Sequence, residues 1–276
     1  MVLKVFQLNT YRGFHLDRVI DFVRRNDIDL CLFQEVAGGG YSLNNDFKNQ
    51  FKTLKEKLDF NGVVVKEINP QKSPQDYFGK ATFFRKNIKV LEEKVIWMKN
   101  PNSKLEFATV IKQEAPRCAL SLKVEVNGQK IYLINTHMAW GPTPFDKIFK
   151  RKQADKLINY LKTLKQPFIL TGDFNLVPST EIVKSFGKFA RNLTSENNTK
   201  FTLNPKIHYL KDDAIKRDLS VDYAFISPQI FLKSFSLITE NLSDHYGILL
   251  ELEVSNETKE PKVTEEKKHL SPLTHL

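Results

Sequence analysis

The sequence predicts an α/β protein built as one domain, in which buried strands alternate with amphipathic helices. Residues 2–8 and 28–33 are apolar runs of strand length, and each is followed directly by polar residues. Between them, apolar residues of the 16–23 segment recur at helical spacing with charged residues in the gaps. That pattern is typical of a helix that covers one face of a sheet. No internal repeat or interdomain linker interrupts the alternation.

The first half of the chain continues with a second helix and a series of short strands. Apolar residues at helical spacing predict a helix over residues 47–58, with Asp46 as its N-cap. The dipeptide Asn127-Gly128 predicts a tight hairpin turn. The strands expected in this half cover residues 63–68, 81–85, 89–98, 104–113, 118–126 and 130–135.

The second half supplies two more helices and three more strands. After a loop over residues 138–145, helical spacing predicts a helix over roughly residues 146–165. A short helix is expected to be capped at Pro178-Ser179, and residues 190–219 are polar and irregular. The strands expected in this half cover residues 168–175, 220–227 and 247–254.

The length and the composition fit one large hydrophobic core. The chain has 276 residues, of which 41% are hydrophobic, enough for one such core or at most two domains. Residues 255–276 are polar and charged and have no apolar periodicity. We therefore expect a folded domain over residues 1–254, followed by a disordered tail over residues 255–276.

The charge balance is basic. The chain has 42 Lys and Arg residues against 32 Asp and Glu residues, a formal charge of +10. This balance favours polyanionic partners, with nucleic acid first and anionic membrane surfaces second. A lysine-rich surface that only keeps the protein soluble is the alternative.

The cysteines and the N-terminus indicate an intracellular protein, and we expect a monomer. Cys31 lies inside an apolar run, which is typical of a reduced core thiol, and one further cysteine does not indicate a disulfide framework. The N-terminal residues lack a signal-peptide pattern, and no apolar run is long enough to span a membrane. We expect a cytoplasmic protein without stable membrane association. Secretion after removal of a leader is the alternative.

The stretch 168–175 is the most informative in the chain. Apolar residues run into Gly172, and Asp173 and Asn175 follow two positions apart. Side chains two apart in a strand point to the same side, so the strand presents an acid and an amide together at a sheet rim. The alternative is a strand followed by an ordinary Asx-type turn.

The same design recurs in other strands. Four of the expected strands end in polar residues, and two begin with them: Asn9, Glu35, His137 and Asp173 with Asn175 at the ends, and Asp222 and Asp244-His245 at the starts. If the last two strands run antiparallel to the first four, all these groups meet on one rim. Clustered carboxylates repel one another unless a cation lies among them, and oxygen ligands suit Mg²⁺. Two histidines beside such an ion suit hydrolysis of a phosphate ester.

These motifs also occur in a known order. The segments 7–9 (Gln-Leu-Asn), 33–35 (Phe-Gln-Glu), 135–137 (Asn-Thr-His), 172–175 (Gly-Asp-Phe-Asn), 221–223 (Val-Asp-Tyr) and 243–245 (Ser-Asp-His) follow the order of the endonuclease/exonuclease/phosphatase superfamily. Over roughly residues 1–254 the chain resembles this superfamily, which has the deoxyribonuclease I-like fold. The resemblance implies a four-layer α/β/β/α sandwich with two mixed β-sheets.

The resemblance also implies how a metal and the attacking water are held. Glu35 matches the principal Mg²⁺ ligand, helped by Asn9, and Asp244 matches the acid at the outer edge of the metal site. Mn²⁺ is the alternative ion. Asp173 matches the residue that orients or deprotonates the attacking water, and Asn175 matches a residue that holds a phosphate oxygen.

Two histidines complete the implied catalytic set. His245 matches the histidine that donates to the phosphoryl oxygens as charge builds in the transition state. Asp222 matches the carboxylate that orients this histidine and keeps it protonated. His137 matches a second histidine that contacts the phosphate. No covalent intermediate is expected, because water attacks phosphorus directly.

The chain departs from one branch of the superfamily. The abasic-site endonucleases usually carry other residues at the positions of Tyr11, Val36-Ala37 and 176–178, so abasic-site repair is not indicated. The chain looks closer to the tyrosyl-DNA phosphodiesterase, deadenylase-like and phospholipid or sphingolipid phosphodiesterase branches. Lys80 occupies a place where relatives often carry Asn or Glu that supports a catalytic histidine.

The loop and helix start at 138–151 are expected to contact the substrate. Trp140, Lys147 and Arg151 mix aromatic and basic character, which suits stacking of a base and tracking of phosphates. Alternatively, Trp140 packs the loop down and the cations are only solvated. We therefore expect a Mg²⁺-dependent phosphodiesterase or nuclease acting on DNA or RNA. The alternatives are hydrolysis of a phospholipid or small phosphate ester, and a non-catalytic nucleic-acid-binding protein of this fold.

Overall fold

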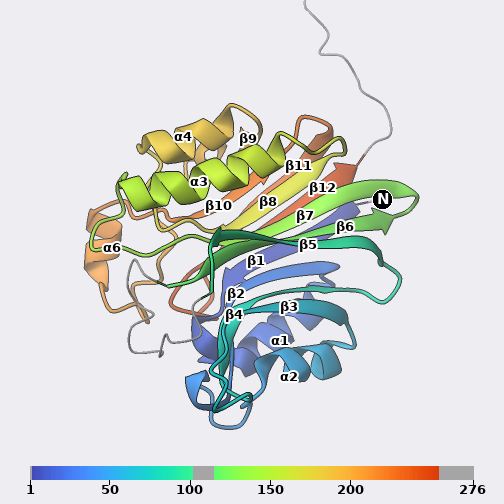
Figure 1. The fold of residues 1–276 in the computed structure, drawn as a ribbon, viewed down its shortest axis with the longest axis vertical. Coiled ribbons are helices and arrows are strands. Elements are labelled where there is room, and N and C mark those ends of the chain that lie inside the picture. The colour runs from blue at the N-terminus through green and yellow to red at the C-terminus, as the bar shows by residue number, and fades with distance from the viewer. Residues whose placement is uncertain (1, 102–114, 255–276) are drawn as a thin grey trace, which may run out of the picture.

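The computed structural model describes residues 2–101 and 115–254. Within these residues the strands form two six-stranded sheets that face each other (Figure 1). The first sheet has the order β11-β12-β1-β2-β4-β3, with bounds Ile230–Ile238, Gly247–Val254, Val2–Asn9, Leu30–Gly38, Tyr77–Phe84 and Asn61–Ile68. The second has the order β5-β6-β7-β8-β10-β9, with bounds Lys89–Lys99, Arg117–Val126, Gln129–His137, Phe168–Asp173, Asp222–Ile226 and Arg191–Asn192.

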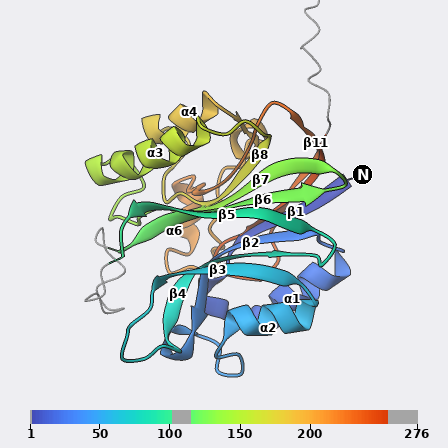
Figure 2. The ribbon, with the colours of Figure 1, turned by 45° about the vertical axis from the view of Figure 1, so that its right-hand side comes forward.

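Helices cover the outer face of each sheet. Helices α1 (Leu16–Arg25) and α2 (Gln50–Leu58) lie on the first sheet, and α3 (Ile148–Leu161) and α4 (Glu181–Gly187) lie on the second (Figures 1 and 2). The short elements are η1 (Tyr11–Gly13), η2 (Gly39–Tyr41), α5 (Leu193–Glu196) and α6 (Asp212–Lys216). The predicted four-layer α/β/β/α sandwich with two mixed sheets is confirmed.

Strand alternation divides the core into layers. In β1, Val5 packs into the core between the sheets, whereas Phe6 packs on the other side against residues of α1. Side chains alternate between the faces of a strand, so both faces of β1 must be apolar. A third cluster lies between the second sheet and helices α3 and α4, and includes Phe174 and Phe225.

The directions of the strands bring the polar termini together. β1 is parallel to β2 and antiparallel to β12, so the ends of the first two strands lie beside the start of the third. In the second sheet, β7 is parallel to β8, and β8 is antiparallel to β10. The expectation that the last two strands oppose the others is confirmed.

Several element boundaries differ from prediction. Helix α2 begins after Asn49, whose side chain accepts from Lys52 N, and not after Asp46. The Asn49 side chain also accepts a hydrogen bond from the Tyr77 hydroxyl at 2.9 Å, and this contact holds it in the N-cap position. Helix α4 is capped by Thr180, which accepts from Val183 N, one residue beyond the predicted Pro178-Ser179.

Other predictions differ in length or cannot be compared. Helix α3 is shorter than the expected 146–165 at both ends, and the 190–219 segment contains β9, α5 and α6. The expected strand 104–113 and the tail 255–276 lie outside the described residues.

Cys31 and Cys118 are buried and free. No helix in the described ranges is both long enough and apolar enough to cross a membrane.

Candidate active site

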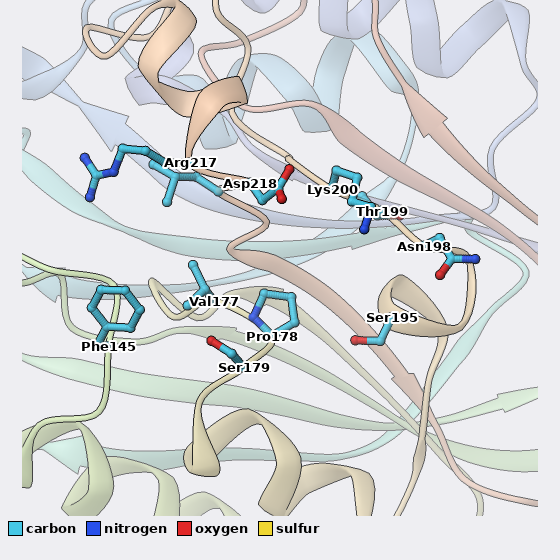
Figure 3. Close-up of a pocket in the computed structure, with 11 residues that line it drawn as sticks. Phe145, Val177, Pro178, Ser179, Ser195, Asn198, Thr199, Lys200, Arg217 and Asp218 are labelled. Atoms are coloured by element: carbon cyan, nitrogen blue, oxygen red, sulfur yellow. The ribbon is translucent and has the colours of Figure 1, made fainter.

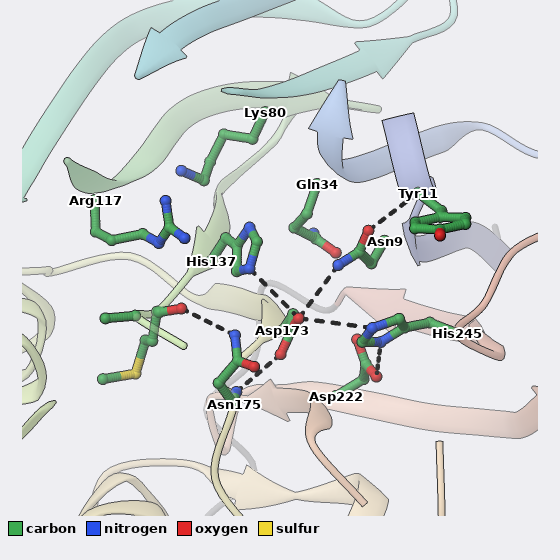
Figure 4. Close-up of polar contacts among 12 residues, drawn as sticks. Asn9, Tyr11, Gln34, Lys80, Arg117, His137, Asp173, Asn175, Asp222 and His245 are labelled. Atoms are coloured by element: carbon green, nitrogen blue, oxygen red, sulfur yellow. Dashed lines mark hydrogen bonds and ion pairs between the residues drawn. The ribbon is translucent and has the colours of Figure 1, made fainter. Parts of the chain in front are cut away.

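The polar strand termini converge on one rim of the sandwich (Figure 4). The register pairs Asp173 at the end of β8 with His137 on one side and with Asp222 on the other. From the first sheet, the Asn9 amide donates to Asp173 Oδ2 at 3.2 Å. Asp173 is therefore the point at which the polar groups of the two sheets meet.

Four polar groups surround the Asp173 carboxylate. Its Oδ1 accepts from the backbone N–H of Asn175 at 2.8 Å. Its Oδ2 lies 3.5 Å from His137 Nε2 and 3.9 Å from His245 Nε2. Burial raises the pKa of Asp173 to about 7, and the Asp222 carboxylate adds to this effect. A carboxyl group with this pKa can exchange a proton near neutral pH.

His245 is held by the buried carboxylate of Asp222. Its Nδ1 lies 2.8 Å from Asp222 Oδ2, which also accepts from the Thr202 hydroxyl at 2.7 Å. Burial by itself lowers the pKa of His245, but the carboxylates of Asp222, Asp244 and Asp173 outweigh burial. The pKa of His245 therefore lies well above its usual value, and the imidazole is a cation at neutral pH.

His137 has the opposite electrostatic character. Burial lowers its pKa well below the usual value, and the positive charges of Arg117 and Lys80 add to this effect. Its Nδ1 has no hydrogen-bond partner among the described residues. The neutral His137 and the cationic His245 thus flank Asp173 on two sides.

A bulge in β2 sets the position of Glu35. The pairing of β2 with β4 shifts register between Gln34 and Val36, and Glu35 adopts a left-handed backbone conformation with φ of 56°. The Thr10 hydroxyl donates to the carbonyls of Gln34 and Glu35 at 2.9 Å and 3.2 Å. Bulges of this kind redirect a side chain, often beside an active site.

Buried carboxylates on this rim could hold a divalent cation, and two groups have ligand atoms within 4.8 Å of one another: His208, Asp244 and His245, and Asp173, Asp222 and His245. Burial raises the pKa of Glu35, and it raises the pKa of Asp244 to about 6. Each of these shifts means that the charged form lacks sufficient compensation in the protein alone, and a hard cation with oxygen ligands would supply it. Glu35 and Asp244 line the same pocket, and the Asn9 amide donates to Asp173, which also lines it.

A buried chain of amides lies beneath these groups and joins the two sheets. Gln7 donates to Gln34 at 2.8 Å, and Gln34 donates to Asn135 at 2.7 Å. Gln7 also donates to Asp222 Oδ1 at 3.1 Å. Because these residues come from β1, β2, β7 and β10, the network fixes the relative positions of four strands where they reach the site.

The site opens into a pocket of about 630 Å³. Cationic and aromatic side chains surround the catalytic groups in its lining: Arg12, Arg117 and Arg217, and Tyr11, Phe78, Trp140 and Tyr209. Arg117 is 3% exposed, and its Nε has no hydrogen-bond partner among the described residues. Burial of a guanidinium N–H without an acceptor is unfavourable, so the pocket is suited to an anionic ligand.

Residues 6–245 match the Endonuclease/Exonuclease/phosphatase family. The chain belongs to this family. Among curated protein sequences, none matches the chain.

Solved structures of the family share the fold. A Bacteroides vulgatus endonuclease/exonuclease/phosphatase superposes with a TM-score of 0.70 at 21% identity, covering 92% of this chain and 100% of that chain. The human Nocturnin catalytic domain, with a bound sulfate anion, has a TM-score of 0.68 at 16% identity, covering 92% and 95%. The mannosyl-6-phosphatase Bt3783 from Bacteroides thetaiotaomicron has a TM-score of 0.66 at 19% identity, covering 91% and 99%. At such low sequence identities, the similarity of these structures to the chain establishes a shared fold.

Most of the predicted site residues lie together. The pocket is lined by Glu35, His137, Asp173, Asn175, Asp244 and His245, with Trp140 at its wall. Asn9 and Asp222 are buried and contact these residues through hydrogen bonds. The whole predicted catalytic and metal-binding set is thus within one connected group.

Two predicted substrate contacts lie elsewhere. Lys147 is the exposed residue before α3, and Arg151 donates to Ser185 of α4 at 3.4 Å. Neither lines the pocket. Successive residues of a helix point in different directions, so Arg151 faces α4, whereas Lys150 is buried against the Asn175 carbonyl.

Lys150 and His208 are neighbours of the site that the sequence grouped only with the other basic residues of the 138–151 and 190–219 segments. Lys150 Nζ donates to the carbonyls of Asn175 at 2.7 Å and Thr143 at 3.2 Å, and burial lowers its pKa to about 8. The His208 ring lies edge-on to His245 at 6.0 Å, and burial lowers its pKa to about 3. Both occur among other basic residues in the sequence, so no local pattern separates them from surface cations.

Proposed function

We propose that the protein is a divalent-metal-dependent phosphodiesterase that hydrolyses phosphodiester bonds in DNA or RNA. The observation that carries the proposal is the placement of Asp173 between His137 and His245, within 4 Å of a nitrogen of each. The carboxylates of Glu35 and Asp244 line the same pocket. Family membership supports hydrolysis of a phosphoric ester.

In this proposal, Asp173 accepts the proton of the attacking water. Its pKa of about 7 lets the carboxylate orient the water and take up a proton in the same pH range. Its Oδ1 is fixed by the Asn175 N–H at 2.8 Å, and its Oδ2, which accepts from the Asn9 amide, lies 3.5 Å from His137 Nε2 and 3.9 Å from His245 Nε2. Asn175 donates its side-chain amide to the Met138 carbonyl at 3.0 Å, which fixes the orientation of this amide in the pocket lining.

His245 stabilises charge on the phosphoryl oxygens. Because Asp222 holds Nδ1, only the Nε2–H of the cation is available to a phosphoryl oxygen. His137 contributes a neutral imidazole from the opposite side of Asp173. When bound by Glu35, Asp244 and Asn9, Mg²⁺ or Mn²⁺ would neutralise part of the phosphate charge.

The pocket lining supports a nucleic acid substrate. Arg12, Arg117 and Arg217 can neutralise phosphates, and Tyr11, Trp140 and Tyr209 offer rings on which bases can stack. The formal charge of +10 favours association with a polyanion.

A small phosphate monoester is the second candidate. It is favoured by the buried Arg117, which suits a terminal phosphate with two charges, and by the similarity in fold to a mannosyl-6-phosphatase.

A cleavage panel separates the candidates. The substrates are duplex DNA, single-stranded DNA, RNA, a 5′-tyrosyl DNA end, a sugar 6-phosphate and a phosphocholine lipid, each with Mg²⁺, Mn²⁺ or EDTA. We expect metal-dependent cleavage of a nucleic acid that is lost in His245→Ala and kept in Asp155→Asn, a matched change of an exposed acid on α3. Turnover of the sugar phosphate or the lipid alone would overturn the proposal.

A further inference from the structure

A second groove adjoins the catalytic pocket (Figure 3). It also has a volume of about 630 Å³, and Arg217 and Leu219 line both hollows. Val177 and Pro178 lie in its middle, between Phe145 on one side and Ser195 on the other. The catalytic pocket therefore adjoins a second hollow whose lining contains none of the hydrolytic residues.

The groove combines an aromatic ring with positive charge. Phe145 is 52% exposed, although burial of a phenylalanine ring is normally favourable. Lys200 and Arg217 are exposed, and among the described residues neither forms an ion pair. Asp218 is the one carboxylate in the lining. The ring and the two cations are the groups that a nucleotide requires, one for its base and the others for its phosphates.

The backbone on both sides of Phe145 is anchored. The carbonyl of Pro144 accepts from Val177 N at 2.9 Å. The carboxylate of Asp146 accepts from the backbone N–H groups of Glu181 and Ile182, at 2.8 Å and 3.1 Å, at the start of α4. The exposed ring thus stands on a fixed backbone, so stacking on it requires little ordering of the protein.

The opposite wall is tied to the catalytic residues. Thr202 N donates to the Leu219 carbonyl at 3.0 Å, which joins the Lys200 and Arg217 segments. The Thr202 hydroxyl also donates to Asp222 Oδ2, the atom that holds His245. Both walls of the groove therefore have defined positions relative to the reacting phosphate.

We propose that this groove binds a nucleotide of a single-stranded nucleic acid adjacent to the scissile phosphodiester, with its base on Phe145 and its phosphates toward Lys200 and Arg217. The inference rests on the proposed function and deepens it. In a duplex the bases are paired and stacked inward, so only a single strand can place a base on an exposed ring. A substrate with one nucleotide would leave the groove empty.

The test compares substrates of different length. With Mg²⁺ present, kcat and KM are measured for the 4-nitrophenyl ester of thymidine 5′-phosphate, for oligothymidylates of increasing length, and for a duplex. The variants are Phe145→Ala and Lys200→Ala. Matched controls are Phe231→Ala and Lys89→Ala, which remove an exposed ring and an exposed cation at the far ends of β11 and β5.

We expect kcat/KM to rise with oligonucleotide length in the native protein. Phe145→Ala should lower kcat/KM for the oligonucleotides by about 5- to 150-fold, mainly through KM, which corresponds to loss of one stacked base. The nitrophenyl ester should be hydrolysed at the native rate by Phe145→Ala, and both controls should behave like the native protein.

The outcomes separate this inference from the function on which it rests. Cleavage of oligonucleotides without a dependence on length, or an equal loss on the nitrophenyl ester in Phe145→Ala, overturns the groove assignment and leaves the nuclease proposal standing. An equal loss on duplex and single strands overturns the preference for single strands. Hydrolysis of phosphate monoesters with no cleavage of any oligonucleotide overturns both.

Discussion

The Nδ1 atom of His245 lies 2.8 Å from the Oδ2 atom of Asp222, and both side chains are buried where the two sheets meet. This contact leaves the other ring nitrogen, Nε2, directed toward Asp173 at 3.9 Å. It determines both the orientation and the charge of the imidazole, because Asp222 is the strongest of the influences that raise the His245 pKa. The pH dependence of hydrolysis should therefore report on this pair.

Replacement of Asp222 by Asn should shift the pH profile. Without the Asp222 carboxylate, the largest influence that raises the His245 pKa against burial is lost, so this pKa should fall. The alkaline limb of the kcat/KM profile should move to lower pH, and kcat/KM should fall by about 10²- to 10⁴-fold at neutral pH. Asp213→Asn, an exposed acid on α6, is the matched control. An unchanged alkaline limb would show that another group sets it.

Replacement of Asp173 by Asn should stabilise the metal-free protein while abolishing hydrolysis. The folded-state pKa of Asp173, about 7, exceeds the usual value of 3.8 for an aspartate carboxyl. The folded state therefore binds more protons than the unfolded state between these values, and its stability falls as the pH rises through this window. Above pH 7 this penalty is complete, and the neutral amide removes it.

The measurement is urea denaturation at pH 5 and pH 8. We expect Asp173→Asn to raise the free energy of unfolding at pH 8 by roughly 1–4 kcal/mol, and by less at pH 5. Asp155→Asn provides the baseline for a change of the same chemistry at an exposed position. A loss of stability at pH 8 would contradict the argument.

The fold and the order of the site motifs along the chain were predictable because both depend on short sequence patterns. Each site motif follows or precedes an apolar run of strand length, and a strand end must lie at a sheet rim. Asn9 and Asp173 come from different sheets and lie 3.2 Å apart, as the common rim requires. The parallel and antiparallel neighbours that bring them together follow from the family resemblance, not from spacing.

Features that depend on distant contacts were not predictable. The Glu35 bulge arises from pairing with β4, and the Asn49 cap depends on Tyr77, which lies 28 positions away in the sequence. Lys150 and Arg151 are adjacent basic residues, but one is buried against two carbonyls and the other faces Ser185. The rotation of α3 about its axis determines which of the two side chains is buried. That rotation depends on packing against neighbouring elements, so it could not be predicted from the sequence.

Replacement of Glu35 by Gln should weaken metal binding. The native protein should gain about 2.7 kcal/mol of unfolding free energy at a Mg²⁺ concentration about 100 times Kd. Loss of the Glu35 charge should remove most of this gain, because the carboxylates on the rim attract the ion. Calorimetric titration and thermal unfolding with and without Mg²⁺ measure the effect. Glu56→Gln on α2 is the control, and an equal Mg²⁺ response in Glu35→Gln would remove Glu35 from the site.

The buried ion pair of Lys80 and Glu67 provides a separate test of the core behind His137. Lys80 Nζ lies 2.6 Å from Glu67 Oε1, and both side chains are 0% exposed. Glu67 Oε1 also accepts from Cys118 N at 2.8 Å. Lys80 thus bonds to Glu67, while Nδ1 of His137 has no hydrogen-bond partner among the described residues.

Replacement of Lys80 by Met should destabilise the protein strongly. It leaves the Glu67 carboxylate buried without its partner, which costs about 3–5 kcal/mol of unfolding free energy. The double variant Lys80→Met with Glu67→Gln should recover much of the loss, since the amide oxygen can still accept from Cys118 N. Lys184→Met breaks an exposed pair with Glu181 and should cost at most about 1 kcal/mol. Because Lys80 does not bond to His137, the double variant should retain hydrolysis, and its inactivity would show that the pair positions the histidine after all.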